Sequence, residues 1–390
     1  MKTENLRTLF HKDEKLAEET YLARFNSPYS RHINIKLNGG EAFYILTDEI
    51  NNKLIEIRKQ DKLCFSLSNK LPDIALKQFI KQCLIDEITS TNDIEGIYSS
   101  RQDINNVLEN LEKQKSNSKF LGLVKSYHYL SKDIKISSSK DVREIYNSLL
   151  LDDIAGDKPD GKIFRKGSVS VTEKGKEIHT GILPEEKIIE YMDRSLKYLN
   201  KRDEDIVVRA AVFHYLLGYI HPFYDGNGRL NRFITSSLLI SELEPLLAYS
   251  LSLAIKNKLD RYYKVFKTCN HILNKGDITP FIEYFVSLIA DTYITINKSL
   301  KEKYAIYKSY KELIEDNSHS ELHDLLLQAT LFSEAGISTS DLLEIVGVSR
   351  ATLRKRLNGI NQDMLKINKI GNEKLYSFRE SSLPLFTTKS

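Results

Sequence analysis

The sequence predicts a mainly helical protein with a few short strands. Over most of its 390 residues, apolar side chains recur three or four positions apart, which is the spacing of one face of an α-helix. Alternating apolar and polar residues, which indicate strands, occur only in short runs. We therefore expect a helical N-terminal segment, a helical core that carries a small β-hairpin, and a winged helix-turn-helix near the C-terminus.

The composition is that of an ordinary globular protein with ample core, and the length predicts two or three domains. A formal net charge of +4 is too small to favour nucleic-acid binding by the chain as a whole. The three cysteines match no metal or redox spacing. Because no signal peptide and no run of about 18 apolar residues is present, we expect a cytoplasmic protein that does not enter a membrane.

The first third of the chain reads as a hairpin followed by helices. Residues 32–37 and 41–46 flank Asn38-Gly39-Gly40, which is a tight-turn signal between two strands. Helical periodicity then runs from residue 48 to about 113, and it resumes from 120 to about 151.

Residues 221–232 lie between two helical patterns. The preceding residues 206–217 are apolar on nearly every side, as in a buried helix, and Pro222 ends that helix at His221. Residues 225–228 then form a tight turn, and a second helix begins at about Arg229.

This loop has the features of an anion site with a base beside it. The turn directs free backbone N–H groups at the start of the second helix toward one point, and Arg229 and Arg232 lie on one face of that helix. Asp225 offers the hard oxygen that Mg²⁺ prefers, and His221 can take a proton from a hydroxyl. Together they predict phosphoryl or nucleotidyl transfer to a hydroxyl. An elbow with a core histidine and two solvated arginines is the plainer alternative for each residue alone.

The same residues resemble the signature of a known family. His-Pro-Phe-x-Asp-Gly-Asn-Gly-Arg-x-x-Arg is similar at every specified position to the motif of the Fic protein adenylyltransferases. These helical enzymes move AMP from Mg-ATP onto a Ser, Thr or Tyr hydroxyl of a protein target. The resemblance implies that His221 is the base and Asp225 the Mg²⁺ ligand. It also implies that the phosphates of ATP are bound by Gly226, Asn227, Gly228, Arg229 and Arg232.

A helix that ends near Gly96 carries an unfavourable charge pattern. Asp93 and Glu95 lie in its last turn, where the helix dipole disfavours anions, and a cation from elsewhere would relieve this. Thr91-x-x-x-Glu95-Gly96 resembles the inhibitory motif of Fic proteins. The resemblance implies that Glu95 pairs with Arg232 and holds the enzyme inactive. The alternative is a solvated glutamate before a turn.

A short alternating run predicts a hairpin within the helical core. The run consists of Val169, Ser170, Val171 and Thr172, and residues 177–180 supply the second strand. The hairpin resembles the flap of Fic proteins, which registers a target segment as an added strand. A plain surface hairpin is the alternative, and we interpret His179 as structural.

Tyr262-Tyr263-x6-Asn270 resembles the tyrosine pair and asparagine that hold adenine and ribose in the Fic family. Aromatic faces stack on bases, and an amide can bond a ring edge. Residues 271–275 make the following link longer than usual. A packed tyrosine pair without a ligand is the alternative.

The C-terminal residues predict a winged helix-turn-helix. Ser338 or Thr339 caps one short helix, Gly347 closes it, and Ser349 caps a second helix that carries four basic residues. Residues 366–369 with 374–376 supply the wing. Such modules bind DNA in some proteins, and in others they bind a protein or form dimers. A DNA partner, a protein partner and a homodimer therefore all remain open.

We expect four parts: an N-terminal helical region with the inhibitory helix (1–115), a Fic catalytic core (116–300), a connector (301–320) and the winged helix (321–385). The expected function is transfer of AMP from ATP, with Mg²⁺, to a hydroxyl of a protein target. The alternatives are a DNA-binding transcriptional regulator whose core senses a nucleotide, and a Fic enzyme that uses another nucleotide or removes AMP.

Overall fold

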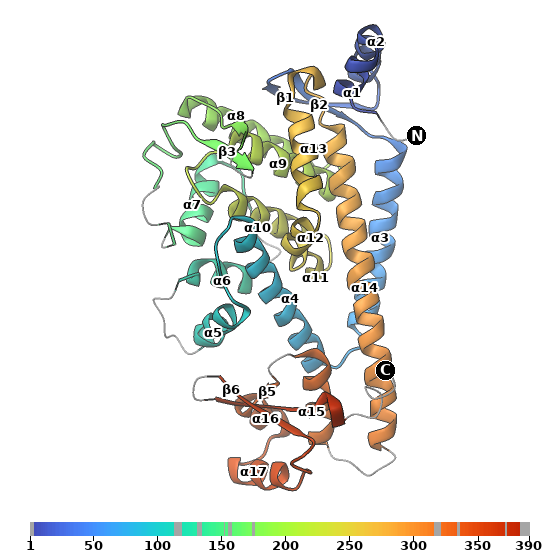
Figure 1. Cartoon of the computed structure of the whole chain (residues 1–390), viewed down its shortest axis with the longest axis vertical. Coiled ribbons are helices and arrows are strands. Elements are labelled where there is room, and N and C mark those ends of the chain that lie inside the picture. The colour runs from blue at the N-terminus through green and yellow to red at the C-terminus, as the bar shows by residue number, and fades with distance from the viewer. Residues whose placement is uncertain are drawn as a thin grey trace. The chain divides into compact units, whose positions relative to one another are not determined.

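The computed structural model describes residues 4–112, 119–130, 135–151, 153–154, 158–173, 176–315, 321–333, 336–370 and 373–382. In these residues the chain is mainly helical and carries small antiparallel sheets, so the expected fold class is confirmed (Figure 1). The chain divides into two compact units. The first consists of Met1–Asp61 and Asp86–Ile294, and the second of Lys62–Ile85 and Thr295–Ser390.

The N-terminal elements are α1 (Leu6–Lys12), α2 (Glu14–Phe25), β1 (Ser30–Leu37), β2 (Gly40–Ile45), α3 (Asp48–Ser68), α4 (Asp73–Ile94) and α5 (Arg101–Glu112). The expected hairpin is present as β1 and β2, which pair in antiparallel fashion across the Asn38-Gly39 turn. The single helical pattern expected from residue 48 to 113 is divided among α3, α4 and α5.

The central elements are α6 (Leu121–His128), α7 (Ser139–Leu150), β3 (Ser170–Glu173), β4 (Lys176–Thr180), α8 (Glu185–Leu199), α9 (Ile206–Ile220), α10 (Asn227–Leu239), α11 (Pro245–Ala248), α12 (Leu251–Asn257), α13 (Leu259–Asn270), the 3₁₀ turn η1 (Ile272–Asn274) and α14 (Thr279–Glu315). Helix α9 packs against both α8 and α10, and every residue of it except Arg209 and Gly218 is buried. Burial of each large apolar side chain of this helix contributes roughly 1.5–3 kcal/mol to the free energy of folding, so α9 is a stable support for the loop that follows it.

The unusual length of the link after α13 has a structural use. The link runs beside β2, where the N–H of Phe43 donates to the carbonyl of Gly276 (3.1 Å) and the N–H of Ile278 donates to the carbonyl of Phe43 (2.8 Å). A Cβ atom on Gly39 would lie 2.4 Å from the carbonyl oxygen of Ile272, so this close approach requires glycine. The link therefore fastens the N-terminal hairpin to the core.

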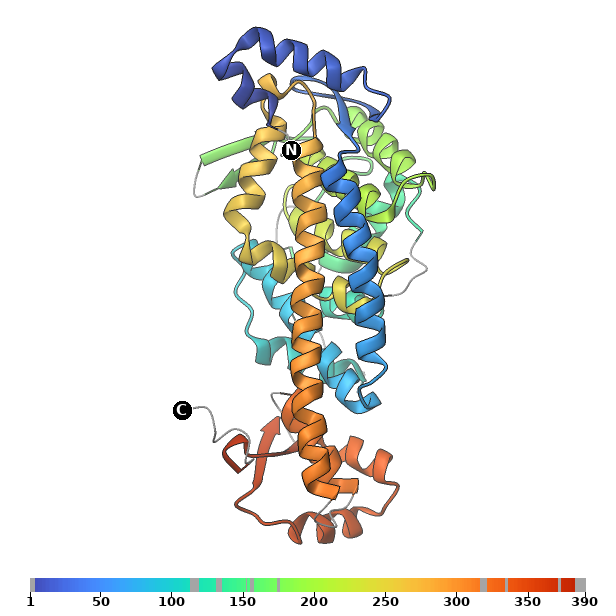
Figure 2. The ribbon, with the colours of Figure 1, turned by 90° about the vertical axis from the view of Figure 1, so that its right-hand side faces the viewer.

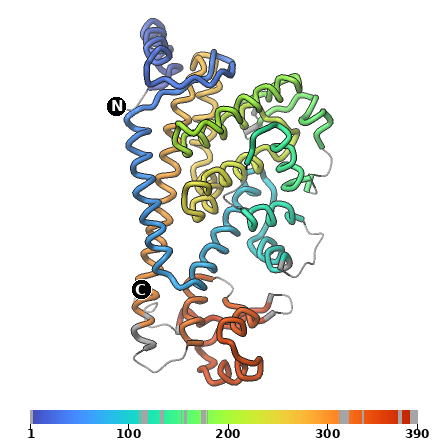
Figure 3. Tube along the Cα trace, turned by 180° about the vertical axis from the view of Figure 1, so that it is seen from behind, coloured from blue at the N-terminus to red at the C-terminus, as the bar shows by residue number. Residues whose placement is uncertain are grey.

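In the first unit, the start of α14 runs beside α3. The Thr47 hydroxyl, directly before α3, donates to the Glu283 carboxylate (3.0 Å), and the Tyr293 hydroxyl bonds Asp61. The two helices lie side by side in Figure 2 and also from behind in Figure 3. Helix α14 continues through residue 301 to Glu315 without a break, so the described part of the expected connector is helical.

The second unit contains α15 (Glu321–Phe332), β5 (Ile337–Ser338), α16 (Thr339–Val346), α17 (Arg350–Asn358), β6 (Leu365–Ile370), β7 (Glu373–Phe378) and the 3₁₀ turn η2 (Glu380–Ser382). Its sheet has the order β5-β7-β6. Ser338 caps α16, Gly347 closes it in the left-handed conformation, and Ser349 caps α17. The caps expected from the sequence are therefore present.

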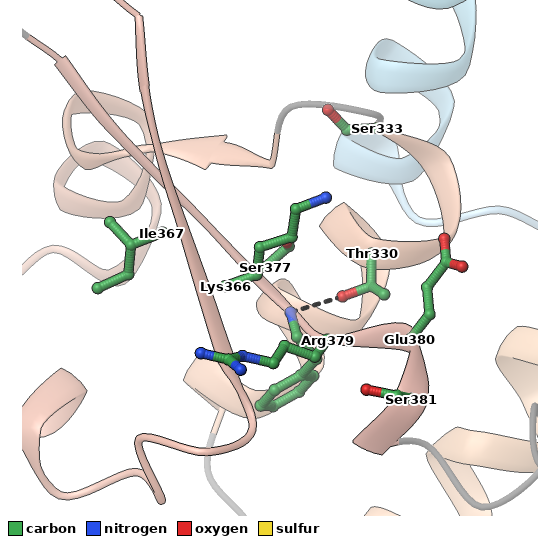
Figure 4. A pocket seen from close by; sticks show the side chains of 9 residues that line it. Thr330, Ser333, Lys366, Ile367, Ser377, Arg379, Glu380 and Ser381 are labelled. Carbon is green, nitrogen blue, oxygen red and sulfur yellow. Dashed lines mark hydrogen bonds between the residues drawn. The ribbon is translucent and has the colours of Figure 1, made fainter.

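A cavity of about 650 Å³ lies between α15 and the β6–β7 hairpin. Thr330 and Lys366 line it, and the Thr330 hydroxyl accepts a hydrogen bond from the backbone N–H of Phe378 (2.8 Å; Figure 4).

The four-part division of the chain stays a prediction. Its boundaries at residues 115, 320 and 385 fall outside the described residues, and the one at 300 lies within α14. No helix among the described residues is long and apolar enough to cross a membrane.

Candidate active site

His221 is the first residue after α9 and opens the loop that leads into α10. Its backbone is left-handed (φ 51°) and its N–H bonds the carbonyl of Leu217, so the helix ends where Pro222 predicted. The left-handed conformation is unfavourable for a residue other than glycine. Tertiary contacts must therefore hold the histidine in place.

Those contacts come from Arg165, whose side chain is fully buried. Its guanidinium donates to the backbone carbonyls of His221 (2.9 Å), Gly167 (2.6 Å) and Ile182 (3.0 Å). Its backbone N–H donates to the carbonyl of Pro222 (3.2 Å). One side chain thus ties the histidine to both ends of the segment that carries β3 and β4.

The imidazole of His221 is held in its neutral form. Burial, together with the neighbouring His179 and the cationic Arg165, lowers the pKa of His221 to about 3. The ring is therefore neutral near pH 7, which is the form that accepts a proton from a hydroxyl. His179 is buried and bonds the carbonyl of Tyr219 (2.5 Å), which suits the structural role expected for it.

The β3–β4 hairpin runs beside this histidine. A Cβ atom on Gly181 would lie 2.2 Å from Nη2 of Arg165 and 3.1 Å from Cβ of His221, so the chain after β4 passes against this histidine. Val171 pairs with His179 across the hairpin. No third strand joins this sheet among the described residues, so a strand edge is open to an added segment.

The other residues named for this hairpin lie on β3 or next to it. Val169 precedes β3, and its carbonyl accepts the N–H of Gly181 (2.9 Å). The Ser170 hydroxyl donates to Glu177 (2.6 Å). Thr172 is described for its backbone alone, which lies opposite Glu177.

The turn of the loop is held by hydrogen bonds within the loop and by packing against Tyr146. Asn227 donates from its side-chain amide to the carbonyl of Phe223 (2.7 Å) and accepts from the N–H of the same residue (2.9 Å). The ring of Tyr146 stacks on Phe223 with centroids 3.7 Å apart, and its hydroxyl donates to the carbonyl of Asp225 (3.2 Å). The side chain of Asn227 is thus used to shape the turn, and the backbone N–H is what remains for a ligand.

Helix α10 begins at Asn227, two residues earlier than expected, because Gly226 takes the left-handed conformation (φ 80°) and serves as its N-cap. The first N–H groups of a helix have no partner within it, so they face the loop as donors. Arg229 is buried (2% exposed), and its Nε atom has no hydrogen-bond acceptor among the described residues. A buried cationic donor of this kind fits an anionic oxygen.

Asp225 fits a magnesium ion that is shared with phosphates. Its carboxylate accepts from the N–H of Gly226 (2.6 Å) and from Arg229 (3.3 Å), and about half of the side chain is exposed. Among the described residues, no group of three His, Cys, Asp or Glu side chains could hold a metal by itself. A single carboxylate suits Mg²⁺ only when substrate phosphates and water complete the octahedron.

The end of α4 forms a well-defined cap around Glu95. The N–H of Ile97 donates to the carbonyl of Asn92 (2.9 Å) and the N–H of Gly96 to that of Asp93 (3.0 Å), while Gly96 is left-handed (φ 70°). This pair of bonds is the Schellman motif, in which Glu95 is the C-cap residue. The Schellman motif therefore fixes the backbone position from which the Glu95 side chain extends.

Arg232 of α10 meets this cap with three hydrogen bonds. Its guanidinium donates to the Thr91 hydroxyl (2.7 Å), to the Thr91 carbonyl (2.9 Å) and to the Glu95 carboxylate (2.7 Å). The Arg232 side chain is 5% exposed and the Glu95 side chain 25%. Lys256 pairs with Asp93 (2.6 Å), so each acid of the last turn has a cation from elsewhere, as its position required.

The carboxylate of Glu95 also lies against the start of α10. A Cβ atom on Gly228 would lie 2.0 Å from Oε1 of Glu95 and 3.0 Å from Nη1 of Arg232. Gly228 is the second residue of α10, where free N–H groups and the positive end of the helix dipole favour an anion. Glu95 therefore occupies space beside the donors that a phosphate would use.

Tyr262 and Asn270 are held by neighbouring side chains. The Tyr262 hydroxyl bonds Nε2 of His214 (3.0 Å), and its ring meets that of Tyr263 edge to face at 5.4 Å. Oδ1 of Asn270 accepts from the Tyr215 hydroxyl (2.7 Å), and Nδ2 of this buried amide has no acceptor among the described residues. The role of these residues in adenine binding stays a prediction.

The Fic/DOC family model matches residues 136–239. The chain carries a Fic domain. This domain contains the β3–β4 hairpin, α8, α9, the loop and α10, whereas Glu95 and Tyr262 lie outside the matched residues. Arg165 and Tyr146, which belong to none of the sequence motifs described above, lie within it. Their role could not be seen from spacing, because each contacts the loop across more than fifty residues of chain.

Curated relatives and a solved structure resemble parts of this chain. A protein adenylyltransferase Fic of Aedes aegypti is 28% identical over 226 residues, which cover 54% of this chain and 41% of that protein. Its namesake in Drosophila melanogaster is 31% identical over 158 residues, which cover 39% and 28%. The chain therefore spans less than half the length of these relatives. A Fic family protein from Desulfovibrio desulfuricans G20 shares the fold, with a TM-score of 0.54 at 21% identity over 86% of this chain and 97% of that one.

Proposed function

We propose that this protein transfers AMP from Mg-ATP to a hydroxyl of a protein target. The observation that carries the proposal is the start of α10, where the buried Nε donor of Arg229 and the free helix N–H groups follow the neutral His221 within one short loop. The names of the relatives, which are adenylyltransferases, support this assignment. The hairpin with its open edge offers a place for a target segment.

In this proposal each group of the loop has one task. His221 accepts the proton of the target hydroxyl while the hydroxyl oxygen attacks the α-phosphorus and pyrophosphate departs. Arg229, Arg232 and the N–H groups of α10 hold the distal phosphates. Asp225 would hold Mg²⁺, which offsets phosphate charge when bound. Arg165 holds the backbone of the base in its left-handed conformation.

We further propose that Glu95 restrains the reaction. Its carboxylate takes one Nη group of Arg232 and lies beside Gly228, so a terminal phosphate cannot use both. ATP bound with its triphosphate displaced would hold the α-phosphorus out of line with the incoming hydroxyl. A displacement of about 1 Å can cost about 10²-fold in rate, so partial occlusion is enough.

The test is labelling by ATP that carries radioactive α-phosphate. Glu95→Gly should raise labelling of a host lysate or of the protein itself about tenfold or more, and Glu95→Gly combined with Arg232→Ala should lose the gain, because both residues share one contact. Absence of label in Glu95→Gly with every nucleotide tried would refute the transfer reaction. Label from another nucleotide, or release of AMP from a modified target, would select one of the alternatives named from the sequence, since the loop binds phosphates and not the base.

A second function is favoured by the distribution of charge. Of the 57 basic and 53 acidic residues, the segment 339–379 holds eight and four, so this segment alone accounts for the net charge of +4. Helix α17 buries Leu353 and Leu357 and exposes its basic side chains, which are Arg350, Arg354, Lys355 and Arg356. A capped helix with an exposed basic face, followed by a β-hairpin, is the arrangement of a winged helix-turn-helix.

We propose that α17 binds duplex DNA through its phosphates. Affinity should then fall steeply with salt, and Arg354→Ala with Lys355→Ala should reduce the slope by about one for each phosphate that the variant no longer binds. Glu344→Ala, which changes an exposed charge on α16, is the matched control. Binding that is weak and independent of salt would exclude this function and favour a protein partner or a second copy of the chain.

A further inference from the structure

Glu87 is a fully buried carboxylate that has no task in the reaction described above. It lies on α4 one turn before Thr91 and two turns before Glu95. Residues four apart share a helix face, so the three side chains form a row on the side of α4 that meets α10. The last two members of the row bond Arg232.

The carboxylate of Glu87 is bonded by groups from two other helices. From α12, the N–H of Ser252 donates to Oε2 (2.6 Å) and its hydroxyl donates to Oε1 (2.5 Å). From α6, the Tyr127 hydroxyl donates to Oε1 (3.2 Å). A buried carboxylate is tolerated only with such partners, because burial without them costs several kcal/mol. Glu87 therefore fixes the position of α4 relative to both helices.

The same neighbours continue to the site. The ring of Tyr127 packs edge to face on Phe233, the residue after Arg232, with centroids 5.1 Å apart. Helix α12 makes a second contact with α4 through Lys256 and Asp93, but these side chains are 41% and 37% exposed. Exposed ion pairs contribute roughly 0–1 kcal/mol, so the buried contact at Glu87 is the stronger of the two.

We propose that Glu87 is a positioning residue for the inhibitory contact, because it fastens α4 to α12 and α6 so that Thr91 and Glu95 reach Arg232. The inference rests on the proposed function, since it concerns the contact that we propose restrains it. Removal of this fastening releases the end of α4 and frees Arg232 for a phosphate.

The ionisation of Glu87 makes the fastening sensitive to pH. Burial raises the pKa of Glu87 to about 7, although Ser252, the cationic Arg232 and Tyr127 lower it. Arg232 from α10 is the charged group that faces it, Tyr127 from α6 is the titratable one, and Ser252 from α12 is a neutral donor; on α4 itself, Asp86 pairs with Arg101 and Glu95 with Arg232. A released and solvated glutamate has a pKa of about 4.3. Release is therefore favoured as pH rises from about 4.3 through 7, and the fastened state is strongest below that window.

The experiment compares three single variants, each made in the full chain with and without Glu95→Gly. Glu87→Ala removes all three bonds and should raise basal ATP labelling about tenfold or more. Glu87→Gln keeps the shape but cannot ionise. Asp93→Asn is the matched control, because it changes the other acid that contacts α12 and should change the rate less than about fivefold. In the Glu95→Gly background, neither change at Glu87 should add to the rate.

Two further readouts separate this inference from the proposed function. Between pH 5.5 and 8, labelling by the wild type relative to Glu95→Gly should rise about tenfold, and Glu87→Gln should abolish that rise. Hydrogen exchange of residues 88–96 should be faster in Glu87→Ala than in Asp93→Asn. If hydrogen exchange is faster in Glu87→Ala but no variant is labelled, the proposed function is refuted, whereas the inference that Glu87 positions the end of α4 stands. Unchanged exchange and an unchanged rate in a folded Glu87→Ala, or a flat pH profile in the wild type, would overturn the inference while Glu95→Gly still transfers AMP.

Discussion

Thr91→Val is the most selective perturbation of the contact between α4 and α10. The Thr91 side chain is fully buried, and its hydroxyl accepts a hydrogen bond from Nε of Arg232 at 2.7 Å. Valine has nearly the same volume, so no cavity is formed and the backbone carbonyl still accepts from the guanidinium. The change therefore removes one bond from a buried cation and leaves Nε without an acceptor.

The magnitude follows from the removal of this single bond. A hydrogen bond to a charged group contributes about 1.5–3 kcal/mol, and a factor of ten in an equilibrium corresponds to about 1.4 kcal/mol. If the contact holds the inhibited state, the ratio of inhibited to released protein should fall roughly 10- to 100-fold. Basal labelling should rise by that factor, up to the rate of Glu95→Gly, which removes the competing carboxylate itself.

The assay is the initial rate of labelling by ATP with radioactive α-phosphate, measured beside thermal unfolding. Thr292→Val is the control, because Thr292 is also buried and, among the described residues, its hydroxyl bonds only the carbonyl of Leu288 within its own helix. The control should lose stability without gaining activity. A wild-type rate in Thr91→Val, while Glu95→Gly is fast, would show that the Thr91 hydroxyl does not support the inhibited state.

Other predictions concern the proposed base His221, the residue Arg165 that holds it, and the loss of stability at low pH. His221→Ala should lower transfer by about 10²–10⁴-fold while ATP binding, followed by calorimetry, stays within about twofold; transfer at the wild-type rate would exclude it as the base. Arg165→Lys keeps a charge, but one ammonium nitrogen cannot replace the three separate guanidinium nitrogens that bond the three carbonyls, so kcat should fall about 10²-fold with KM for ATP unchanged, whereas an equal rise in KM would indicate general damage to the fold. Burial lowers the pKa of His214 to about 3, so its contribution to stability is complete above pH 6.5 and is lost as pH falls toward 3. Melting temperatures should drop over that window and drop less in His214→Gln, and equal acid sensitivity of the two proteins would contradict this assignment.

Features with local signals could be predicted from the amino-acid sequence alone. Pro222 ends α9 at His221, Gly96 closes α4, and Ser338 and Ser349 cap their helices, because backbone conformation and capping depend on neighbouring residues. The spacing within residues 221–232 likewise placed an aspartate, a glycine turn and two arginines at one helix start. The charge conflict at the end of α4 required a cation from elsewhere, and Arg232 is such a cation.

The distant groups that complete the site became visible only in the folded chain. Arg165 supports His221 across 56 residues, and Glu87 bonds Ser252 across 165. Nothing in their local sequence distinguishes these two residues from other charged side chains. Their function exists only after packing removes them from water, because a buried charge must then find partners wherever the fold provides them. The grouping of residues 62–85 with the C-terminal unit likewise depends on tertiary contacts, which their helical pattern does not reveal.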